Sequence, residues 1–186
     1  MSPHHTMSAL VGAVVAQGRD NADALHLIRP GLDLWAEYEV REAAGHGERL
    51  DESDLYPDVR TALRTLRDAG LWVGVAGNQT VRVAGLLRAL ELPVDGLATS
   101  GEWGVAKPSA EFFERVCAWS GFPPGEIAYV GDHPHNDVVP AKASGLRAVH
   151  LRRGPWGYLF ADSDQARQAD WRIESIAELP GLLAGA

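Results

Sequence analysis

Apolar and polar positions along the chain follow one pattern before residue 55 and another after it. The first 50 residues carry only helical spacing, in segments 6–17, 20–28 and 30–45, and the stretch 45–54 is polar, as a linker is. From residue 55 onward, short apolar runs of strand length alternate with amphipathic helices. The predicted strands are residues 71–76, 95–99, 127–130, 146–151 and 171–173, and the predicted helices are residues 57–70, 80–90, 108–121, 136–144 and 175–183.

Strands that alternate with helices of about three turns predict right-handed crossovers and a parallel sheet covered on both faces. The predicted fold class is therefore α/β with a doubly wound parallel sheet, in which residues 55–186 form the core and residues 1–54 form a small helical segment. In such sheets ligands bind just beyond the carboxyl ends of the strands.

The N-terminal segment contains an apolar run, residues 9–16, whose periodicity alone fits a helix or a strand. Thr6 or Ser8 can cap a helix through this run, and we favour that interpretation. By the same reasoning Asp20 or Asn21 caps the second helix, and Pro30 fits the first turn of the third.

The composition is that of a globular protein and narrows the range of partners. The chain has 186 residues, 46% hydrophobic and 23% charged, with a formal net charge of −8. Such a charge disfavours nucleic acid and anionic lipid as partners. The apolar run near residue 9 is too short for the ~20 residues of a membrane-spanning helix, and a cytoplasmic location is expected. One cysteine, Cys117, excludes an internal disulfide, and its helical pattern places it in the core.

Chemistry-bearing residues follow the first two predicted strands of the core. Gly77 and Asn78 stand at a strand–helix junction, where a glycine lets the backbone approach an anion; the alternative is an ordinary turn. Lys107 comes just before a helix that begins with Pro108 and suits a phosphate or a carboxylate, although most lysines simply face solvent.

The loop after the third predicted strand carries two carboxylates, Asp132 and Asp137. One stands at the strand tip and the other in the first helical turn, so both can converge on Mg²⁺, which takes one or two carboxylates and completes its shell with water. The alternative is that Asp137 complements the helix dipole while Asp132 caps a turn. His133 and His135 could ligate a transition metal, but we interpret both as polar residues lining the loop. Trp156 is expected in a turn that rims the site.

The order of these signals, strand–Gly–Asn, Lys–Pro opening a helix, and then Gly-Asp-x-x-x-x-Asp, resembles the haloacid dehalogenase superfamily of hydrolases. The resemblance covers residues 55–186 and implies a helical cap for the residues before them. It implies that Gly77, Asn78 and Lys107 bind phosphate, that Lys107 and Asp132 are catalytic, and that Asp132 and Asp137 hold Mg²⁺.

Two departures from the pattern of the superfamily bear on activity. Gly77 stands where the superfamily has Ser or Thr, so one hydroxyl donor is absent. The superfamily's nucleophile lies in an Asp-x-Asp motif at the end of a strand ahead of the cap, and no such motif is found there. The early acidic residues Asp20, Asp23 and Asp33 follow no strand.

A missing central strand would leave an apolar slot and two open sheet edges, which would favour self-association. Three explanations stay open: a sequence that begins downstream of the strand, a strand lent by a partner or a second copy, or residues 9–16 filling the slot. We favour the first.

The function expected from the resemblance is a magnesium-dependent phosphatase acting on a small phosphorylated molecule, rather than a 2-haloacid dehalogenase. The alternative is a catalytically inactive module that binds a phosphorylated ligand or a protein partner. A dinucleotide-binding protein is disfavoured, because Gly-Asn-Gln-Thr stands where a Gly-x-Gly-x-x-Gly loop is needed.

Overall fold

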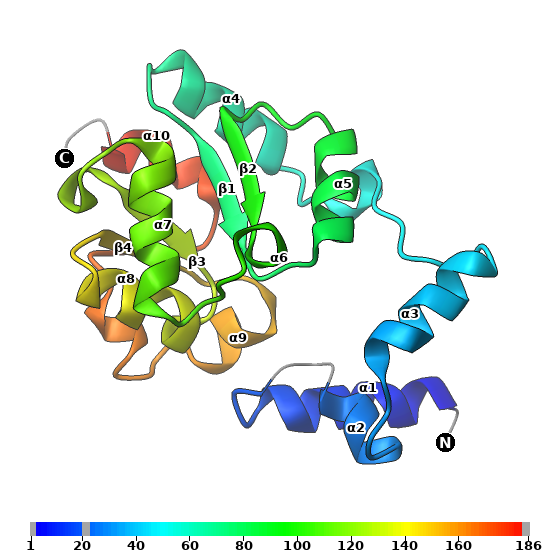
Figure 1. The fold of residues 1–186 in the computed structure, drawn as a ribbon. Helices are drawn as coiled ribbons and strands as arrows, with labels where there is room; N and C mark the ends of the chain where they lie inside the picture. Colours follow the sequence, from blue (N-terminus) through cyan, green and yellow to red (C-terminus); the bar gives the residue numbers. More distant parts are fainter. Residues whose placement is uncertain (1–2, 20–22, 184–186) are drawn as a thin grey trace. The chain divides into compact units, whose positions relative to one another are not determined.

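The computed structural model describes residues 3–19 and 23–183, and the chain divides into two compact units, Met1–Arg49 and Leu50–Ala186. The bounds of these units lie five residues from the division predicted from the sequence. Because Figure 1 colours the chain from N- to C-terminus, the first unit appears in blue.

The first unit consists of helices α1 (Pro3–Val15), α2 (Asp23–Ile28) and α3 (Leu34–Ala43). The prediction of a helix through residues 9–16 is confirmed, but α1 begins at Pro3 instead of being capped by Thr6 or Ser8. The predicted caps Asp20 and Asn21 lie outside the described residues.

The third helix starts later than expected. The Asp33 carboxylate accepts a hydrogen bond from the Ala36 amide at 3.1 Å and caps α3, so Pro30 lies before the helix and not in its first turn. A side-chain cap satisfies an amide that would otherwise lack an intrahelical acceptor, and this fixes where the helix begins.

The second unit alternates strands with helices. Its strands are β1 (Gly74–Gly77), β2 (Gly96–Thr99), β3 (Ala128–Gly131), β4 (Arg147–Leu151) and β5 (Trp171–Ile173). Its α-helices are α4 (Val59–Asp68), α5 (Val81–Ala89), α6 (Ser100–Trp103), α7 (Ala110–Ser120), α8 (Val139–Ala143), α9 (Gly154–Leu159) and α10 (Leu179–Leu183). Single turns of other helix types are η1 (Glu52–Asp54), η2 (Pro124–Glu126), η3 (Pro134–Val138, π-helical), η4 (Ala166–Gln168) and η5 (Ile176–Glu178).

All described strand pairs are parallel, which confirms the predicted α/β class. β1 pairs with β2 with Gly74 opposite Gly96, and β4 lies between β3 and β5. Hydrogen bonding divides the strands into two sheets, β1–β2 and β3–β4–β5, where the sequence predicted one.

A tyrosine side chain links the two sheets. In a parallel ladder alternate residues bond to the same neighbour. The Val73 carbonyl accepts from the Asp95 amide at 2.7 Å, so Val73 faces β2 and Ala76 faces away from it. The Tyr129 hydroxyl of β3 donates to the Ala76 carbonyl at 3.1 Å. Among the described residues no backbone ladder joins β1 to β3, and this side-chain bond spans the space between them.

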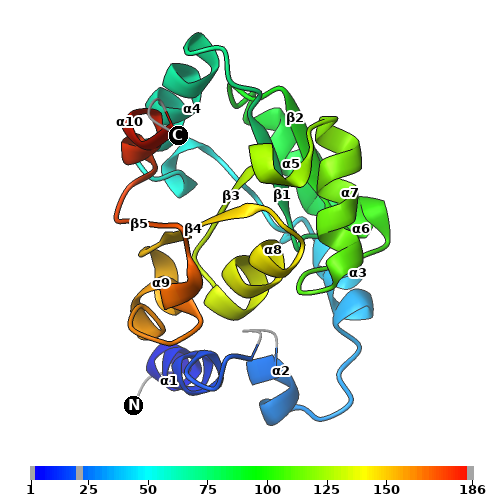
Figure 2. The ribbon, with the colours of Figure 1, turned by 90° about the vertical axis from the view of Figure 1, so that its left-hand side faces the viewer.

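Helices cover both faces of the three-stranded sheet. One cluster of buried side chains joins Phe112, Phe113 and Val116 of α7 to Tyr129 and Ala148. Cys117 packs against this cluster, as its position in the helix predicted. On the other face, Leu66 of α4 and Leu179 of α10 pack with Val149 and Ile173. Figure 2 shows α4 and α10 side by side, away from α7.

Four local predictions differ from the structure. Pairing in the first strand begins at Gly74 and not at residue 71, because the Val73 amide donates to the Asp95 carboxylate at 2.8 Å instead of to a neighbouring strand. The helix predicted at 136–144 is a π-helical turn followed by α8. Helix α6, capped by Thr99, was not predicted. Trp156, expected in a turn, lies in α9, which starts with Pro155 in its first turn, where proline is tolerated.

We expect Tyr129→Phe to lower the free energy of unfolding by about 1 kcal/mol, because the Ala76 carbonyl loses its partner in a half-buried position. Chemical denaturation measures this change. Tyr158→Phe is the control, because Tyr158 is 60% exposed, and its effect should stay within about 0.5 kcal/mol. Equal effects of the two substitutions would contradict a structural role for the hydroxyl.

Candidate functional site

The loop after β3 folds Asp137 back onto the strand end. The Asp137 carboxylate is buried, and its Oδ2 accepts a hydrogen bond from the His133 amide at 2.9 Å. A Cβ atom built at Gly131 would collide with the Asp137 carboxyl group. Only glycine at position 131 therefore leaves room for this carboxylate, which the π-helical turn of η3 brings inward.

Lys107 reaches the same point from the loop before α7. Its Nζ lies 2.5 Å from Asp137 Oδ1, and the two side chains are 14% and 4% exposed. Burial lowers the pKa of Lys107, but the Tyr129 oxygen and the Asp137 carboxylate outweigh burial, and the net shift is upward. Lys107 is thus a cation held in a buried ion pair, 5.6 Å from the centre of the Tyr129 ring.

The Asn78 side chain binds the backbone of Lys107. Its side-chain amide donates to the Lys107 carbonyl at 2.9 Å and accepts from the Lys107 amide at 2.8 Å. This pair of bonds fixes the backbone of Lys107 to the end of β1, so the Asn78 side chain positions the lysine. Whether the Asn78 main chain binds phosphate stays a prediction.

Gly77, the other predicted phosphate ligand, is open. A Cβ atom at this position would meet no described atom within 4 Å. The neighbouring Thr80 hydroxyl accepts from the Val83 amide at 3.2 Å and caps α5. The space beside Gly77 would accommodate the Ser or Thr side chain that the resemblance leads one to expect.

Asp132 is the carboxylate of the loop that remains open to a ligand. It is half-buried, and no other described side chain donates a hydrogen bond to it. Burial, together with the nearby charge of Asp137, raises the pKa of Asp132 to about 6, although its own amide and the charge of Lys107 oppose this. A raised pKa means that the ionised carboxylate lacks compensation, which a bound cation would supply.

The donor chemistry at this loop fits a hard cation, since carboxylate oxygens are the ligands that Mg²⁺ takes. Both Asp137 oxygens already have partners, so Asp132 is the more available ligand. Within residues 3–19 and 23–183, no group of three or more His, Cys, Asp or Glu is arranged to hold a metal ion. A cation here would therefore need water or further ligands, and the metal assignment of Asp132 and Asp137 stays a prediction.

The two histidine rings of the loop lie 6.5 Å apart, centre to centre, and have different surroundings. His133 is 9% exposed and stacks on Trp156, with 5.3 Å between ring centroids, and on Phe160 at 6.2 Å. His135 is exposed. His133 thus packs among aromatic rings, while His135 faces solvent.

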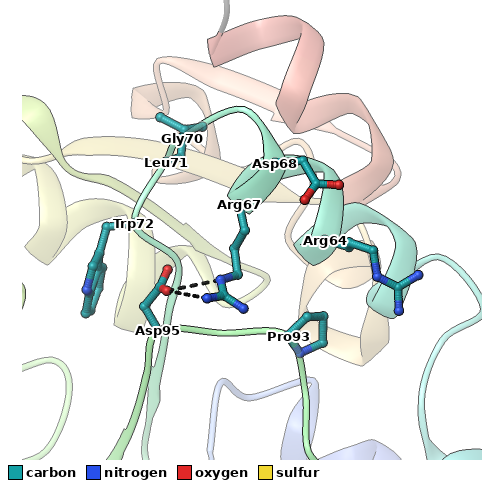
Figure 3. Close-up of a pocket in the computed structure, with 8 residues that line it drawn as sticks. All are labelled: Arg64, Arg67, Asp68, Gly70, Leu71, Trp72, Pro93 and Asp95. Carbon is teal, nitrogen blue, oxygen red and sulfur yellow. Dashed lines mark hydrogen bonds and ion pairs between the residues drawn. The ribbon is translucent and has the colours of Figure 1, made fainter.

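A pocket lies away from these residues, at the amino ends of β1 and β2 (Figure 3). Its volume is about 530 Å³, and Arg67 inside it is paired with Asp95 at 2.9 Å. The lining residues are Arg64, Arg67, Asp68, Gly70, Leu71, Trp72, Pro93 and Asp95. Because Arg67 is already paired with Asp95, it is less available to a ligand than the carboxylate of the loop after β3.

The parallel α/β core thus carries Lys107, Asp132 and Asp137 at the carboxyl ends of its strands. The chain belongs to the haloacid dehalogenase-like hydrolases, whose family model matches residues 7–145, more than half of the sequence. This match confirms the resemblance seen in the sequence.

Several curated relatives are named as phosphatases. The chain is 32% identical over 131 residues to a glyceraldehyde 3-phosphate phosphatase of Methanocaldococcus jannaschii, a match that covers 69% of this chain and 56% of the relative. It is 31% identical over 144 residues to a phosphoglycolate phosphatase of Haemophilus influenzae, covering 74% and 62%. The matches thus span little more than half the length of these relatives.

Solved structures share the fold. A HAD phosphatase of Thermococcus onnurineus superposes with a TM-score of 0.62 at 23% identity, covering 96% of this chain and 90% of that one. A 2-haloacid dehalogenase of Pseudomonas syringae gives a TM-score of 0.59 at 25% identity, covering 96% and 70%. Similarity to both kinds of enzyme is expected for a shared fold, which does not by itself determine the reaction.

We expect Gly131→Ala to lower the free energy of unfolding by about 3 kcal/mol, because the added methyl group displaces Asp137 and leaves Lys107 unpaired in a buried place. Gly77→Ala is the matched control and should change stability by less than about 0.5 kcal/mol, because nothing described obstructs its Cβ. Urea denaturation compares the two, and a tolerated Gly131→Ala would show that the loop has room.

When no metal is present, the ionised Asp132 carboxylate should lower the free energy of unfolding at neutral pH. Its pKa in the folded chain is about 6 and its ordinary value is 3.8, so the folded state binds the proton more tightly and stability falls as pH rises through this window. We expect Asp132→Asn to be more stable than the wild type at pH 7.5, by about 1–2 kcal/mol, and the difference to vanish near pH 4. Urea denaturation with a chelator measures it, with Asp164→Asn (91% exposed) as control. If Asp132→Asn is less stable than the wild type at pH 7.5, the pKa of Asp132 is not raised in the folded chain.

Proposed function

We propose that this chain is a magnesium-dependent phosphatase-type hydrolase of the haloacid dehalogenase superfamily, acting on a small phosphorylated molecule. The observation that supports this proposal most directly is the buried ion pair of Lys107 and Asp137, whose charges both affect the pKa of the nearby Asp132 carboxylate. The phosphatase names of the curated relatives support the substrate class.

Each residue then has a distinct task. Lys107 supplies positive charge to a phosphoryl group or to the carboxylate that attacks it, and Asp137 holds the amine in place. Asp132 would hold Mg²⁺, which when bound supplies charge neutralisation to phosphate oxygens. The open backbone at Gly77 and Asn78 faces the same end of the strands and would bind further phosphate oxygens.

The nucleophile of the reaction is not among these residues. No Asp-x-Asp sequence follows a strand ahead of β1. Asp162 and Asp164 do have this spacing. They follow α9, however, and their side chains are 92% and 91% exposed, so they face solvent. Covalent phosphoryl transfer needs a positioned carboxylate. We therefore propose that these 186 residues bind ligand and metal but turn over phosphate esters poorly.

A second candidate is a binding module without catalysis, which the glycine at position 77 and the missing nucleophile favour. Both candidates predict the same ligand binding and little turnover by these 186 residues. The predicted absence of a nucleic-acid partner, the cytoplasmic location and the self-association through an open sheet edge all stay predictions. Among the described helices, none is both long and apolar enough to cross a membrane.

Calorimetric titration with Mg²⁺ and then with orthovanadate tests the proposal. We expect Mg²⁺-dependent vanadate binding that Asp132→Asn weakens at least tenfold and Asp164→Asn leaves unchanged. Hydrolysis of p-nitrophenyl phosphate should be close to background for the same protein. Absence of both binding and turnover would contradict the assignment, and robust turnover abolished by Asp132→Asn would show that a nucleophile is present after all.

A further inference from the structure

A second ion pair ties together three distant parts of the Leu50–Ala186 unit. Arg153 donates to both carboxylate oxygens of Asp58, from Nη1 to Oδ1 at 2.9 Å and from Nη2 to Oδ2 at 2.8 Å. The Ser175 hydroxyl donates to the same carboxylate at 2.5 Å, and the Arg153 guanidinium lies 4.2 Å from the centre of the Tyr56 ring. We call these four residues the Asp58 clamp.

The clamp is more than an ordinary surface contact. The Arg153 and Asp58 side chains are only 16% and 18% exposed, and the pairing is bidentate, the geometry in which arginine binds carboxylates most specifically. Asp58 stands at the N-cap position of α4 but makes no capping bond there. Its carboxylate is committed to Arg153, and the hydrogen bonds from Arg153 lower the pKa of Asp58 to about 2. The clamp therefore stays ionised at all ordinary pH values.

Arg153 is followed directly by the first turn of α9, which packs on Asp132. Gly154 has a φ of +69°, and a Cβ atom on it would lie 2.8 Å from Asp132 Oδ2. A Cβ atom on Gly157 would lie 3.3 Å from Asp132 Cβ and 2.7 Å from the Leu151 carbonyl. Gly154 and Gly157 thus let the backbone of residues 154–157 pack closely on the Asp132 side chain. A larger residue at either position would collide with its surroundings.

We propose that the Asp58 clamp positions Asp132 by holding the Gly154–Gly157 turn against its carboxylate. Arg153 is a positioning residue: its guanidinium points to Asp58 while its backbone leads into Gly154. The clamp would then set the orientation of the Asp132 carboxylate toward a cation, an inference that rests on the proposed function. Groups behind a metal ligand commonly change metal affinity by 10- to 100-fold, about the size of effect expected here.

Titration with Mg²⁺ tests the clamp in Asp58→Asn and in Arg153→Lys, which keeps the charge but loses the bidentate geometry. We expect both to weaken Mg²⁺ binding about tenfold at a temperature where circular dichroism shows each fully folded. Glu174→Gln is the matched control, because Arg152 and Glu174 form a neighbouring ion pair at 2.9 Å that is 49% and 62% exposed. Wild-type Mg²⁺ affinity in folded Asp58→Asn would overturn the proposal.

A readout without metal separates this proposal from the proposed function. In the apo protein, Asp58→Asn should shift the amide NMR resonances of Asp132 and Gly154, whereas Glu174→Gln should leave them in place. If the wild type binds no Mg²⁺ but these resonances move as expected, the metal assignment fails and the clamp stands. If the resonances of Asp132 and Gly154 do not move in Asp58→Asn, the clamp is refuted whatever the metal does.

Discussion

The structure of the site depends on the buried ion pair between Lys107 and Asp137. Neither group could be buried alone, because removing a single charge from water costs far more than the chain can recover elsewhere. The pair is satisfied on both sides: Asp137 also accepts from the His133 amide, and Asn78 fixes the backbone of Lys107. The loop after β3 and the loop before α7 must therefore fold together.

This pairing also decides which carboxylate is left for chemistry. The charge of Asp137 is balanced by Lys107. Asp132 lies beside it with no matching hydrogen-bond donor, and its pKa is raised to about 6. Two aspartates five residues apart thus have different roles, one structural and one open to a ligand. The separation of roles arises from position: Asp137 is turned inward by the π-helical turn η3, and Asp132 stays at the strand tip beside Gly154.

The sequence was sufficient to predict the five strands and, apart from α6 and α9, the helices between them, because a period of two or 3.6 and the flanking Gly and Pro residues are local signals. It also placed Lys107, Asp132 and Asp137 at strand ends. It could not show that Asn78 binds the Lys107 backbone, or that Arg153 meets Asp58, because those contacts join residues 29 and 95 positions apart. Helix α9 was missed because Gly154 and Gly157 resemble turn residues, while their actual function is close packing on Asp132.

Because the strands form two separate sheets, the Lys107–Asp137 ion pair also connects one sheet to the other. Lys107 is fixed to β1 through Asn78, and Asp137 is fixed to β3 through its loop. Because no described ladder joins β1 to β3, the Tyr129–Ala76 hydrogen bond and the ion pair are the polar links between the two halves of the site, beside the apolar packing of Ala76 against the core. Loss of either charge should therefore weaken the contact between the two sheets as well as the site.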